Sequence, residues 1–508
     1  MTIRLAEPFA RVRTKIVATV GPASRSPETL GELINVGVDV FRLNFSHGTH
    51  DDHTETLARI RDASAAADRL IPVLQDLGGP KIRLGVIPGD SVVCALNDVF
   101  TLVRDRTEDD PRQLTCTYRE LPDDLKVGDP LLFADGAVAM IVTAAEPGRV
   151  KLSVTLAGII KTKQGINLPG AALKVEALTP KDLLDLDWTA AHQVEYVGLS
   201  FVRRAEDVTR LRAELAARGC HARIIAKIEK PEAVDNLASI IAVSDAVMVA
   251  RGDLGVEMDV ARVPAIQKQI ISACHRARVP VITATQMLNS MEQSSRPTRA
   301  EATDVFNAVL DGTDAVMLSG ETAAGLYPVE AASTMSRIVT EAERHLFSGE
   351  YGARDHTPAY ASPANAIPSN ANLVLADAIE DGPSASSKIT PITEALAEAA
   401  SLVSRRLDAA LLVVATRSGR TALTLSKLRH ATPTIALADT LENARAMGLF
   451  WGVTALHVPG IVDGQHAMKV AIDWAKARNL VEKGDCVVLV RGWLPSTTVH
   501  NALLVDVI

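Results

Sequence analysis

Short apolar runs alternate with helical patterns from residue 13 to residue 340, and this alternation restricts the fold more than any other feature of the chain. The runs are rich in aliphatic side chains and have the length of strands buried inside a parallel sheet. Eight such runs predict an α/β fold built as a (β/α)8 TIM barrel, with a doubly wound open sheet as the alternative. The expected strands are Lys15–Val20, Val38–Phe45, Ile71–Asp76, Tyr196–Val202, Ile224–Glu229, Ala246–Arg251, Val281–Gln286 and Ala315–Ser319.

One stretch breaks the alternation. Residues 86–177 contain short β-rich runs separated by Gly, Pro and Asp, and helical periodicity is almost absent there. This pattern predicts a small all-β domain inserted between a first barrel part at residues 1–85 and a second part at residues 178–348. Because the loops that follow barrel strands surround the active mouth, we expect the insert to act as a lid.

The C-terminal third has a different organisation. Residues 349–387 are rich in Pro, Ala, Ser and Asn, which is typical of a linker or a mobile insertion. A second α/β unit, a C-terminal regulatory domain, is expected over residues 388–508. Its predicted strands are Ala410–Ala415, Thr434–Ala438, Thr454–Val458, Cys486–Val490 and Leu503–Val507.

Composition narrows the range of partners. The 508 residues are too many for one core, and the net charge of −8 argues against nucleic acid or a membrane surface as the main partner. No apolar run reaches the length of a membrane span, and the N-terminus lacks the apolar core of a signal peptide. The five cysteines are scattered without CxxC spacing, which indicates reduced thiols in a cytoplasmic protein.

Charged residues end the fifth and sixth expected strands. Lys227 and Glu229 are two residues apart, so their side chains share one face of a strand, and Arg251 and Asp253 have the same spacing. If the two strands are neighbours, one ammonium group and two carboxylates meet at one mouth of the sheet. Mg²⁺ takes such oxygen ligands, and a lysine beside it suits a transferring phosphoryl group or an enolate. A buried ion pair that joins two strands is the alternative.

Polar or ionisable residues also follow most of the other expected strands, whereas the strand bodies stay apolar. Barrel enzymes place their catalytic groups at the carboxyl ends of strands. The cationic residues match phosphate geometry and the carboxylates can hold cations, so the set indicates phosphoryl transfer with a metal. These residues are Arg42, Asn44, Ser46, His47, Asp76, Lys81, Arg83, Thr285, Ser319 and Glu321.

Seven barrel segments, in order along the chain, resemble the pyruvate kinase family. They cover the region from about Thr14 to Arg344, and the β insert and the C-terminal unit match the family in position and length, with weaker motifs. The segments are Arg42-Leu-Asn-Phe-Ser-His-Gly48, Asp76 with Gly-Pro-Lys-Ile-Arg83, Ala226-Lys-Ile-Glu229, Met248-Val-Ala-Arg-Gly-Asp-Leu-Gly255, Ala284-Thr-Gln-Met-Leu288, Arg296-Pro-Thr-Arg-Ala-Glu301 and Met317-Leu-Ser-Gly-Glu-Thr322.

The resemblance implies transfer of the phosphoryl group of phosphoenolpyruvate to ADP, giving ATP and an enolate that is protonated to pyruvate, in glycolysis. It implies that Glu229 and Asp253 hold Mg²⁺ (or Mn²⁺), that Lys227 stabilises charge on the transferring group and the enolate, and that Arg42 grips the phosphoryl group. It assigns the substrate carboxylate to Thr285, Gly252 and Asp253, the proton relay to Ser319, Glu321 or Thr285, and the nucleotide to Asn44, His47 and Arg83.

Two departures from the family pattern concern ions and the nucleotide. Many members bind K⁺ through residues matching Asn44, Ser46, Asp76 and the carbonyl of Leu77, and they have Glu where this chain has Lys81 and Thr where it has Leu77. This pair resembles the K⁺-independent branch, because an ammonium group can replace the ion; a solvated surface lysine is the alternative. Gln164 replaces the usual lysine that faces the nucleotide, so contact is expected from Lys163, with a solvated lysine equally in view.

A phosphate cradle is expected in the C-terminal unit. In the segment from Thr416 to Thr421, hydroxyls, a glycine and helix N-terminal amides stand between a strand and a helical run, and the segment resembles the family's allosteric effector loop. An N-capped turn is the alternative. The distal loop, Arg491-Gly-Trp-Leu-Pro-Ser-Thr-Thr498, differs from the family, so the identity of the phosphorylated effector stays open; the resemblance also implies a homotetramer. The expected effector residues are Thr416, Ser418, Gly419, Arg420 and Thr421.

Two other function classes compete with the kinase. A Mg²⁺-dependent lyase or mutase acting on a keto acid or enolate could use Glu229 and Asp253 equally well, but Arg83 and the lid argue for a nucleotide. A non-catalytic effector sensor would not need the intact set of Lys227, both carboxylates and Thr285. A requirement for ADP separates the first alternative from the kinase.

Overall fold

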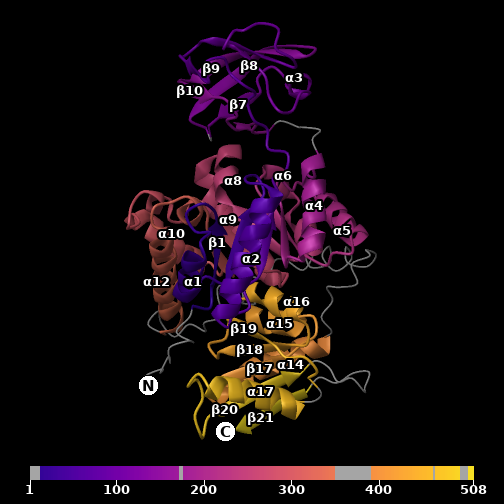
Figure 1. Cartoon of the computed structure of the whole chain (residues 1–508), viewed down its shortest axis with the longest axis vertical. Helices are drawn as coiled ribbons and strands as arrows, with labels where there is room; N and C mark the ends of the chain where they lie inside the picture. Colours follow the sequence, from indigo (N-terminus) through magenta and orange to yellow (C-terminus); the bar gives the residue numbers. More distant parts are fainter. Residues whose placement is uncertain (1–11, 135, 171–175, 349–390, 462–463, 492–501) are drawn as a thin grey trace, which may run out of the picture.

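The computed structural model describes residues 12–134, 136–170, 176–348, 391–461, 464–491 and 502–508. The predicted linker at residues 349–387 and most of the distal loop 491–498 lie outside the described residues. Three bodies follow one another along the longest axis of the molecule: the β-rich insert at one end, the barrel in the middle and the C-terminal α/β unit at the other end (Figure 1).

The described residues confirm the predicted α/β barrel. Eight strands close in the order β1-β16-β15-β14-β13-β12-β3-β2, and every neighbouring pair is parallel. Their bodies are almost wholly buried because helices cover the outside and packed side chains fill the inside. The strands are β1 (Lys15–Val20), β2 (Val40–Asn44), β3 (Val73–Asp76), β12 (Tyr196–Leu199), β13 (Arg223–Ile228), β14 (Ala246–Ala250), β15 (Val281–Ala284) and β16 (Ala315–Leu318).

Helices surround this barrel and carry ordinary end signals. Four begin with a capping box or a hydroxyl cap, as at Thr49, Thr179 and Thr298, where the side chain accepts a backbone N–H of the first turn. They are α1 (Pro27–Val36), α2 (His50–Ala66), α4 (Pro180–His192), α5 (Ala205–Ala217), α6 (Pro231–Asp235), α7 (Leu237–Val243), α8 (Arg251–Glu257), η1 (Val260–Arg262), α9 (Val263–Arg276), η2 (Asn289–Glu292), α10 (Arg299–Leu310), α11 (Gly320–Ala323) and α12 (Pro328–Phe347).

The insert after β3 is rich in sheet, as expected, and has its own apolar core. It lies beyond the carboxyl ends of the barrel strands, and the bridge between Arg83 and Gly165 ties it to the loop after β3 (Figure 1). Its elements are β4 (Ser91–Cys94), β5 (Val99–Val103), β6 (Gln113–Leu114), α3 (Leu121–Asp124), β7 (Pro130–Phe133), β8 (Val138–Glu146), β9 (Arg149–Leu156), β10 (Gly158–Lys161) and β11 (Ile166–Asn167).

The C-terminal unit packs on the opposite end of the barrel, where the strands begin (Figure 1). Its sheet has the order β19-β18-β17-β20-β21, in which β21 is antiparallel. None of the helices in the described ranges combines the length and the apolar character that a membrane span requires. The elements are α14 (Pro391–Arg406), β17 (Leu411–Ala415), α15 (Arg420–Lys427), β18 (Thr434–Ala438), α16 (Leu441–Ala446), η4 (Met447–Leu449), β19 (Val453–His457), α17 (Gly464–Lys476), β20 (Cys486–Arg491) and β21 (Ala502–Val507).

Candidate active site

Lys227 lies at the centre of the barrel mouth. Its Nζ is 2.9 Å from Glu229 Oε1 and 3.2 Å from Asp76 Oδ1, and it donates a hydrogen bond to Ser200 Oγ at 2.7 Å. Burial alone would lower the pKa of Lys227, but the two carboxylates outweigh burial and raise it. The ammonium group is therefore charged at neutral pH and held in one position by oxygens from three strands.

Glu229, directly after β13, is almost fully buried. Its Oε2 accepts the backbone N–H of Phe201 at 2.7 Å, and Phe201 has a positive φ of 57°. Burial raises the pKa of Glu229 to about 6, the ammonium group of Lys227 opposes this rise, and the carboxylate of Asp253 adds to it. Lys227 is shared between two carboxylates, so it does not neutralise Glu229 completely.

The charges at this mouth suit a divalent cation. Two cationic side chains, Arg42 and Lys227, face three carboxylates, those of Asp76, Glu229 and Asp253, which leaves one negative charge in excess. In the described part of the chain no group of three or more His, Cys, Asp or Glu residues could hold a metal unaided. Mg²⁺ is commonly held by one or two carboxylates together with water and substrate oxygens, so Glu229 and Asp253 fit it.

Arg42 also contacts Asp76, the carboxylate that lies beside Lys227. Its Nε donates to Asp76 Oδ2 at 2.8 Å, one Nη lies 2.6 Å from the same oxygen, and the other donates to Thr19 Oγ1 at 2.9 Å. Burial would raise the pKa of Asp76, but Lys227 and Arg42 lower it below its usual value. Asp76 thus fixes both cations that are expected to face the phosphoryl group.

The prediction that Arg251 ends the sixth strand was wrong. The strand stops at Ala250, and Arg251 begins α8 and turns away from the mouth. Its guanidinium group pairs with Asp304 at 2.6 Å and donates to the carbonyl oxygen of Thr285 at 2.8 Å. The helical turn places the N–H of Gly252 against Thr285 Oγ1 at 2.7 Å. Arg251 therefore clamps the loop after β15.

Thr285 itself is in an unusual backbone conformation. Its φ is +68°, which a β-branched residue rarely adopts, and Gln286 follows at +53°. Such strain persists only where the surroundings impose it, and here the Arg251 clamp and the Gly252 hydrogen bond do so. The result is a hydroxyl that lies beside the backbone of Gly252.

Ser319 and Glu321 follow β16. Both carboxylate oxygens of Glu321 accept backbone N–H groups, from Leu288 at 3.0 Å and from Ser319 at 2.7 Å, so Glu321 holds two loops in place. By contrast, Ser319 Oγ is buried and has no hydrogen-bond partner among the described residues. Glu292 lies so close that a Cβ at Gly320 would fall 1.9 Å from its Oε1. Burial, together with the charge of Glu321, raises the pKa of Glu292.

The residues expected near the nucleotide form a cationic rim. Asn44 Oδ1 accepts the N–H of Ser46 at 3.1 Å, and both Ser46 and His47 are exposed. Burial of part of the ring lowers the pKa of His47, and the positive charges of Arg83, Lys81 and Arg42 lower it further. Lys81 therefore contributes positive charge at this rim.

Leu77 and Lys163 complete the predicted set. The carbonyl oxygen of Leu77 accepts a hydrogen bond from Ser200 Oγ at 2.8 Å, and the same hydroxyl accepts a hydrogen bond from Lys227 Nζ. Lys163 is exposed, with a φ of +64°, and its carbonyl oxygen accepts Arg83 Nη1 at 3.3 Å. Its backbone thus connects the insert to the rim.

The predicted effector loop, residues 416–421, joins β17 to α15. Gly419 has a φ of +82° and its N–H donates to Thr416 Oγ1 at 3.1 Å; Arg420 Nε donates to Ser418 Oγ at 3.1 Å. The loop touches the barrel, because a guanidinium nitrogen of Arg223, the first residue of β13, donates to the carbonyl oxygen of Ser418 at 3.2 Å.

Sequence reasoning missed four residues that position the site. Ser200 and Phe201 lie inside the expected fourth strand, Tyr196–Val202, but the strand ends at Leu199, so they stand at its carboxyl end, where barrel enzymes place functional groups. Thr19 is the penultimate residue of β1 and carries the same signal. Asp304 gave none, because it lies on α10, 53 residues from the arginine that it holds.

Comparisons with known proteins agree with this geometry. A family model described as "Pyruvate kinase, barrel domain" matches residues 11–332, and one described as "Pyruvate kinase, alpha/beta domain" matches residues 394–505. A pyruvate kinase of Agrobacterium vitis is 41% identical over 95% of both chains, and one of Geobacillus stearothermophilus is 38% identical over 94% of this chain and 77% of its own. A crystal structure of a pyruvate kinase from Cryptosporidium parvum superposes with a TM-score of 0.84 at 32% identity, covering 98% of this chain and 96% of the other.

Proposed function

The chain belongs to the pyruvate kinase family of phosphotransferases, and from this premise we propose how its own residues transfer the phosphoryl group of phosphoenolpyruvate to ADP. The observation that carries the proposal is the placement of Lys227 between Asp76 and Glu229 at the barrel mouth, beneath the insert. We take residues 86–177 as the lid and residues 388–508 as the regulatory domain.

The substrate is held by charge and by backbone. Arg42, fixed by Asp76, binds the phosphoryl oxygens, and Lys227 stabilises the negative charge that moves onto the bridging oxygen as the enolate forms. The carboxylate of the substrate lies against the Gly252 backbone, Asp253 and the Thr285 hydroxyl. Mg²⁺ or Mn²⁺ held by Glu229 and Asp253 supplies charge neutralisation when bound.

We propose that the Ser319 hydroxyl delivers the proton that converts the enolate to pyruvate. Both oxygens of Glu321 accept backbone N–H groups, and Thr285 Oγ1 donates to Ala284 O at 2.6 Å. The buried Ser319 hydroxyl is therefore a better candidate for the proton donor than Glu321 or Thr285. A Ser319→Ala variant should lose exchange of the C3 protons of pyruvate with D₂O more than it loses ATP formation; equal losses contradict the assignment.

The decisive test is a coupled assay of pyruvate formation with Lys227→Met, and with Lys268→Met as the matched control. Lys268 pairs with Asp311 on the outside of the barrel and is largely exposed. Turnover should require ADP and should fall by several orders of magnitude only in the first variant, with the circular dichroism spectrum unchanged. Near-normal turnover in Lys227→Met, or pyruvate formation without ADP, would overturn the proposed function.

We propose that Lys81 makes the enzyme independent of K⁺. After burial and the charge of Arg83, the charge of Lys81 lowers the pKa of His47, and this effect supports the proposal that the ammonium group supplies the positive charge of a monovalent ion bound near Asn44, Ser46 and Asp76. Turnover should be undiminished in K⁺-free buffer, and Lys81→Glu should acquire K⁺ dependence while Lys161→Glu on the lid should not. Strong stimulation of the wild type by K⁺ contradicts this part.

The effector loop is proposed to bind a phosphorylated metabolite. The left-handed Gly419, the Thr416 and Ser418 hydroxyls and the start of α15 form a concave donor set, and Arg420 adds positive charge. Titration of activity with sugar phosphates and nucleotides should shift the half-saturating concentration of phosphoenolpyruvate in the wild type but not in Ser418→Asp. Identical curves would remove the site. We also propose that the protein is cytoplasmic and forms a homotetramer. Light scattering can test the number of chains in the assembly.

A further inference from the structure

The hydroxyl of Thr19 joins two parts of the barrel mouth. Thr19 is buried near the end of β1, and its Oγ1 accepts a hydrogen bond from Arg42 Nη1 at 2.9 Å. The same Oγ1 donates to the carbonyl oxygen of Leu318 at 2.9 Å. A hydroxyl has one proton, so the carbonyl oxygen takes that proton and the guanidinium group takes a lone pair. One oxygen atom thus links the cation expected at the phosphoryl group to the residue directly before Ser319.

The contact with Thr19 sets the orientation of the Arg42 guanidinium group. Arg42 Nε donates to Asp76 Oδ2 at 2.8 Å, and Nη2 lies 2.6 Å from the same oxygen. Because these two contacts converge on one atom, Asp76 alone would let the guanidinium group pivot about it. Thr19 holds the remaining nitrogen and so supplies a second point of attachment. The orientation matters because a planar guanidinium fork meets phosphate oxygens in a bidentate way only in one plane.

The turn that carries Ser319 is hydrogen-bonded to Thr19 on both sides. Before Ser319, the carbonyl oxygen of Leu318 accepts the Thr19 hydroxyl, and after it, Thr322 Oγ1 donates to the carbonyl oxygen of Thr19 at 2.8 Å. Ser319 Oγ itself has no hydrogen-bond partner among the described residues. The position of this hydroxyl therefore depends on its backbone, which Thr19 holds together with Glu321.

We propose that Thr19 is a positioning residue that keeps Arg42 and Ser319 in one fixed arrangement around the substrate. The inference rests on the proposed function, in which Arg42 binds the phosphoryl oxygens and Ser319 delivers the proton to C3 of the enolate. A displacement of about 1 Å can lower the rate of a reaction roughly a hundredfold, so both groups must keep their places during the two steps. If they do not, the enolate leaves before Ser319 protonates it, and water then protonates either face.

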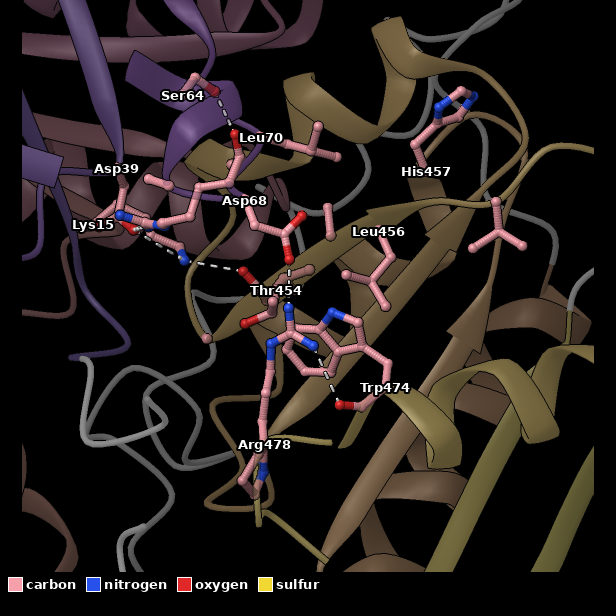
Figure 2. Close-up of a pocket in the computed structure, with 18 of the residues that line it drawn as sticks. Lys15, Asp39, Ser64, Asp68, Leu70, Thr454, Leu456, His457, Trp474 and Arg478 are labelled. Atoms are coloured by element: carbon pink, nitrogen blue, oxygen red, sulfur yellow. Dashed lines mark hydrogen bonds and ion pairs between the residues drawn. The ribbon is translucent and has the colours of Figure 1, made fainter. Parts of the chain in front are cut away.

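The strand that carries Thr19 is also anchored at its other end. Asp39 Oδ2 accepts the backbone N–H of Ile16 at 3.0 Å, and Lys15 Nζ lies 3.8 Å from Asp39 Oδ1 (Figure 2). The same ammonium group donates to the carbonyl oxygen of Val453 in the C-terminal unit at 2.9 Å. All of β1 is buried and pairs with β2 on one side and β16 on the other. Removal of the Thr19 hydroxyl should therefore leave the strand in place.

The experiment measures the handedness of the methyl group of pyruvate. Phosphoenolpyruvate with one deuterium at a defined position of C3 is turned over with ADP in tritiated water, so protonation of each face gives a different enantiomer of a chiral methyl group. The wild type should give one enantiomer. Thr19→Ala should give a mixture and should lower kcat/KM for phosphoenolpyruvate roughly tenfold or more, because a buried hydrogen bond to a charged group is lost. Thr19→Ser keeps the hydroxyl and should match the wild type in both measurements.

Two further variants separate positioning from a purely structural role. Thr340→Ala removes a threonine hydroxyl from α12, where Oγ1 donates to the carbonyl oxygen of Ser336 at 2.8 Å, and should change neither measurement. Thr322→Ala removes the hydrogen bond to the Thr19 backbone and leaves the contacts of Arg42 intact. It should give a mixture of enantiomers with an unchanged KM for phosphoenolpyruvate. A purely structural role would lower the melting temperature but would leave a single enantiomer.

Three results overturn the inference: a single enantiomer from Thr19→Ala, a Thr19→Ser variant that behaves as Thr19→Ala does, or both enantiomers from the wild type. If Thr19→Ala does not fold, a single enantiomer from Thr322→Ala overturns it instead. Failure of the proposed function gives a different result, because the wild type would then form no pyruvate from phosphoenolpyruvate and ADP. That result would reject the proposed function, and this inference with it, before any variant is measured.

Discussion

Protonation of Glu229 is expected to control metal binding within the accessible pH range. With a pKa of about 6, which burial sets in spite of Lys227, the carboxylate fraction falls from about nine-tenths at pH 7 to about one-tenth at pH 5. A divalent cation binds the carboxylate and not the carboxylic acid. The apparent affinity for Mn²⁺ should therefore fall roughly tenfold from pH 7 to pH 5.

The assay is Mn²⁺ binding to the substrate-free protein, followed by electron paramagnetic resonance between pH 5 and pH 8. Glu229→Gln should bind Mn²⁺ weakly at every pH, and Glu232→Gln, on the neighbouring α6, should reproduce the wild-type curve. An affinity that stays constant down to pH 5 in the wild type would refute the reasoning, because it would mean that Glu229 is already ionised there or is not a ligand.

The same pKa shift predicts the sign of a stability change. The folded-state pKa of Glu229, about 6, lies above its unfolded value of 4.5, so the stabilising contribution is fully present below pH 4.5 and is lost as the pH rises through 6. The loss amounts to ~2 kcal/mol for the metal-free protein. Bound Mg²⁺ reverses the trend, because it stabilises the ionised carboxylate. The rise in melting temperature caused by Mg²⁺ should therefore grow between pH 5 and pH 7.

Four further substitutions test the supporting structure. Ser200→Ala removes the hydroxyl that bonds Lys227 at 2.7 Å, and kcat should fall roughly tenfold with little change in the KM for ADP. Gly21→Ala should lower the melting temperature because its Cβ would lie 2.4 Å from a backbone carbonyl oxygen, whereas Gly31→Ala, in open space on α1, should raise it slightly. Arg223→Gln should keep turnover without effector but weaken the response to it, as effector titration can measure.

The sequence was sufficient to predict the barrel because its signals are local. Apolar runs of strand length mark β1 to residue accuracy, at Lys15–Val20, and the other barrel strands to within a few residues. The catalytic candidates followed from one geometric rule, that polar residues at the carboxyl ends of parallel strands meet. At the mouth the ammonium group of Lys227 lies 2.9 Å from Glu229 and 3.2 Å from Asp76.

The features that could not be predicted from the sequence depend on contacts between residues that are far apart in the chain. Nothing in the run that ends at Ala250 shows that Arg251 begins a helix, because the carboxylate that holds it, Asp304, is 53 residues away. The positive φ of Thr285 contradicts the preference of a β-branched residue, and it is held by the contacts from Arg251 and Gly252. The backbone preference of a β-branched residue therefore predicts the wrong conformation for Thr285.

The barrel strands also offer a physical route between the two ends of the molecule. Arg223 begins β13 and bonds the effector loop, while the other end of β13 carries Lys227 and Glu229. The far end of α15 is fixed in the same way, because Lys427 pairs with the fully buried Asp314 at 2.6 Å, directly before β16. Removing one partner of a buried pair is costly, so this contact resists sliding. The loop before α15 and the last residue of α15 are thus tied to the amino ends of β13 and β16, so we expect a ligand that shifts α15 to act on both strands at once.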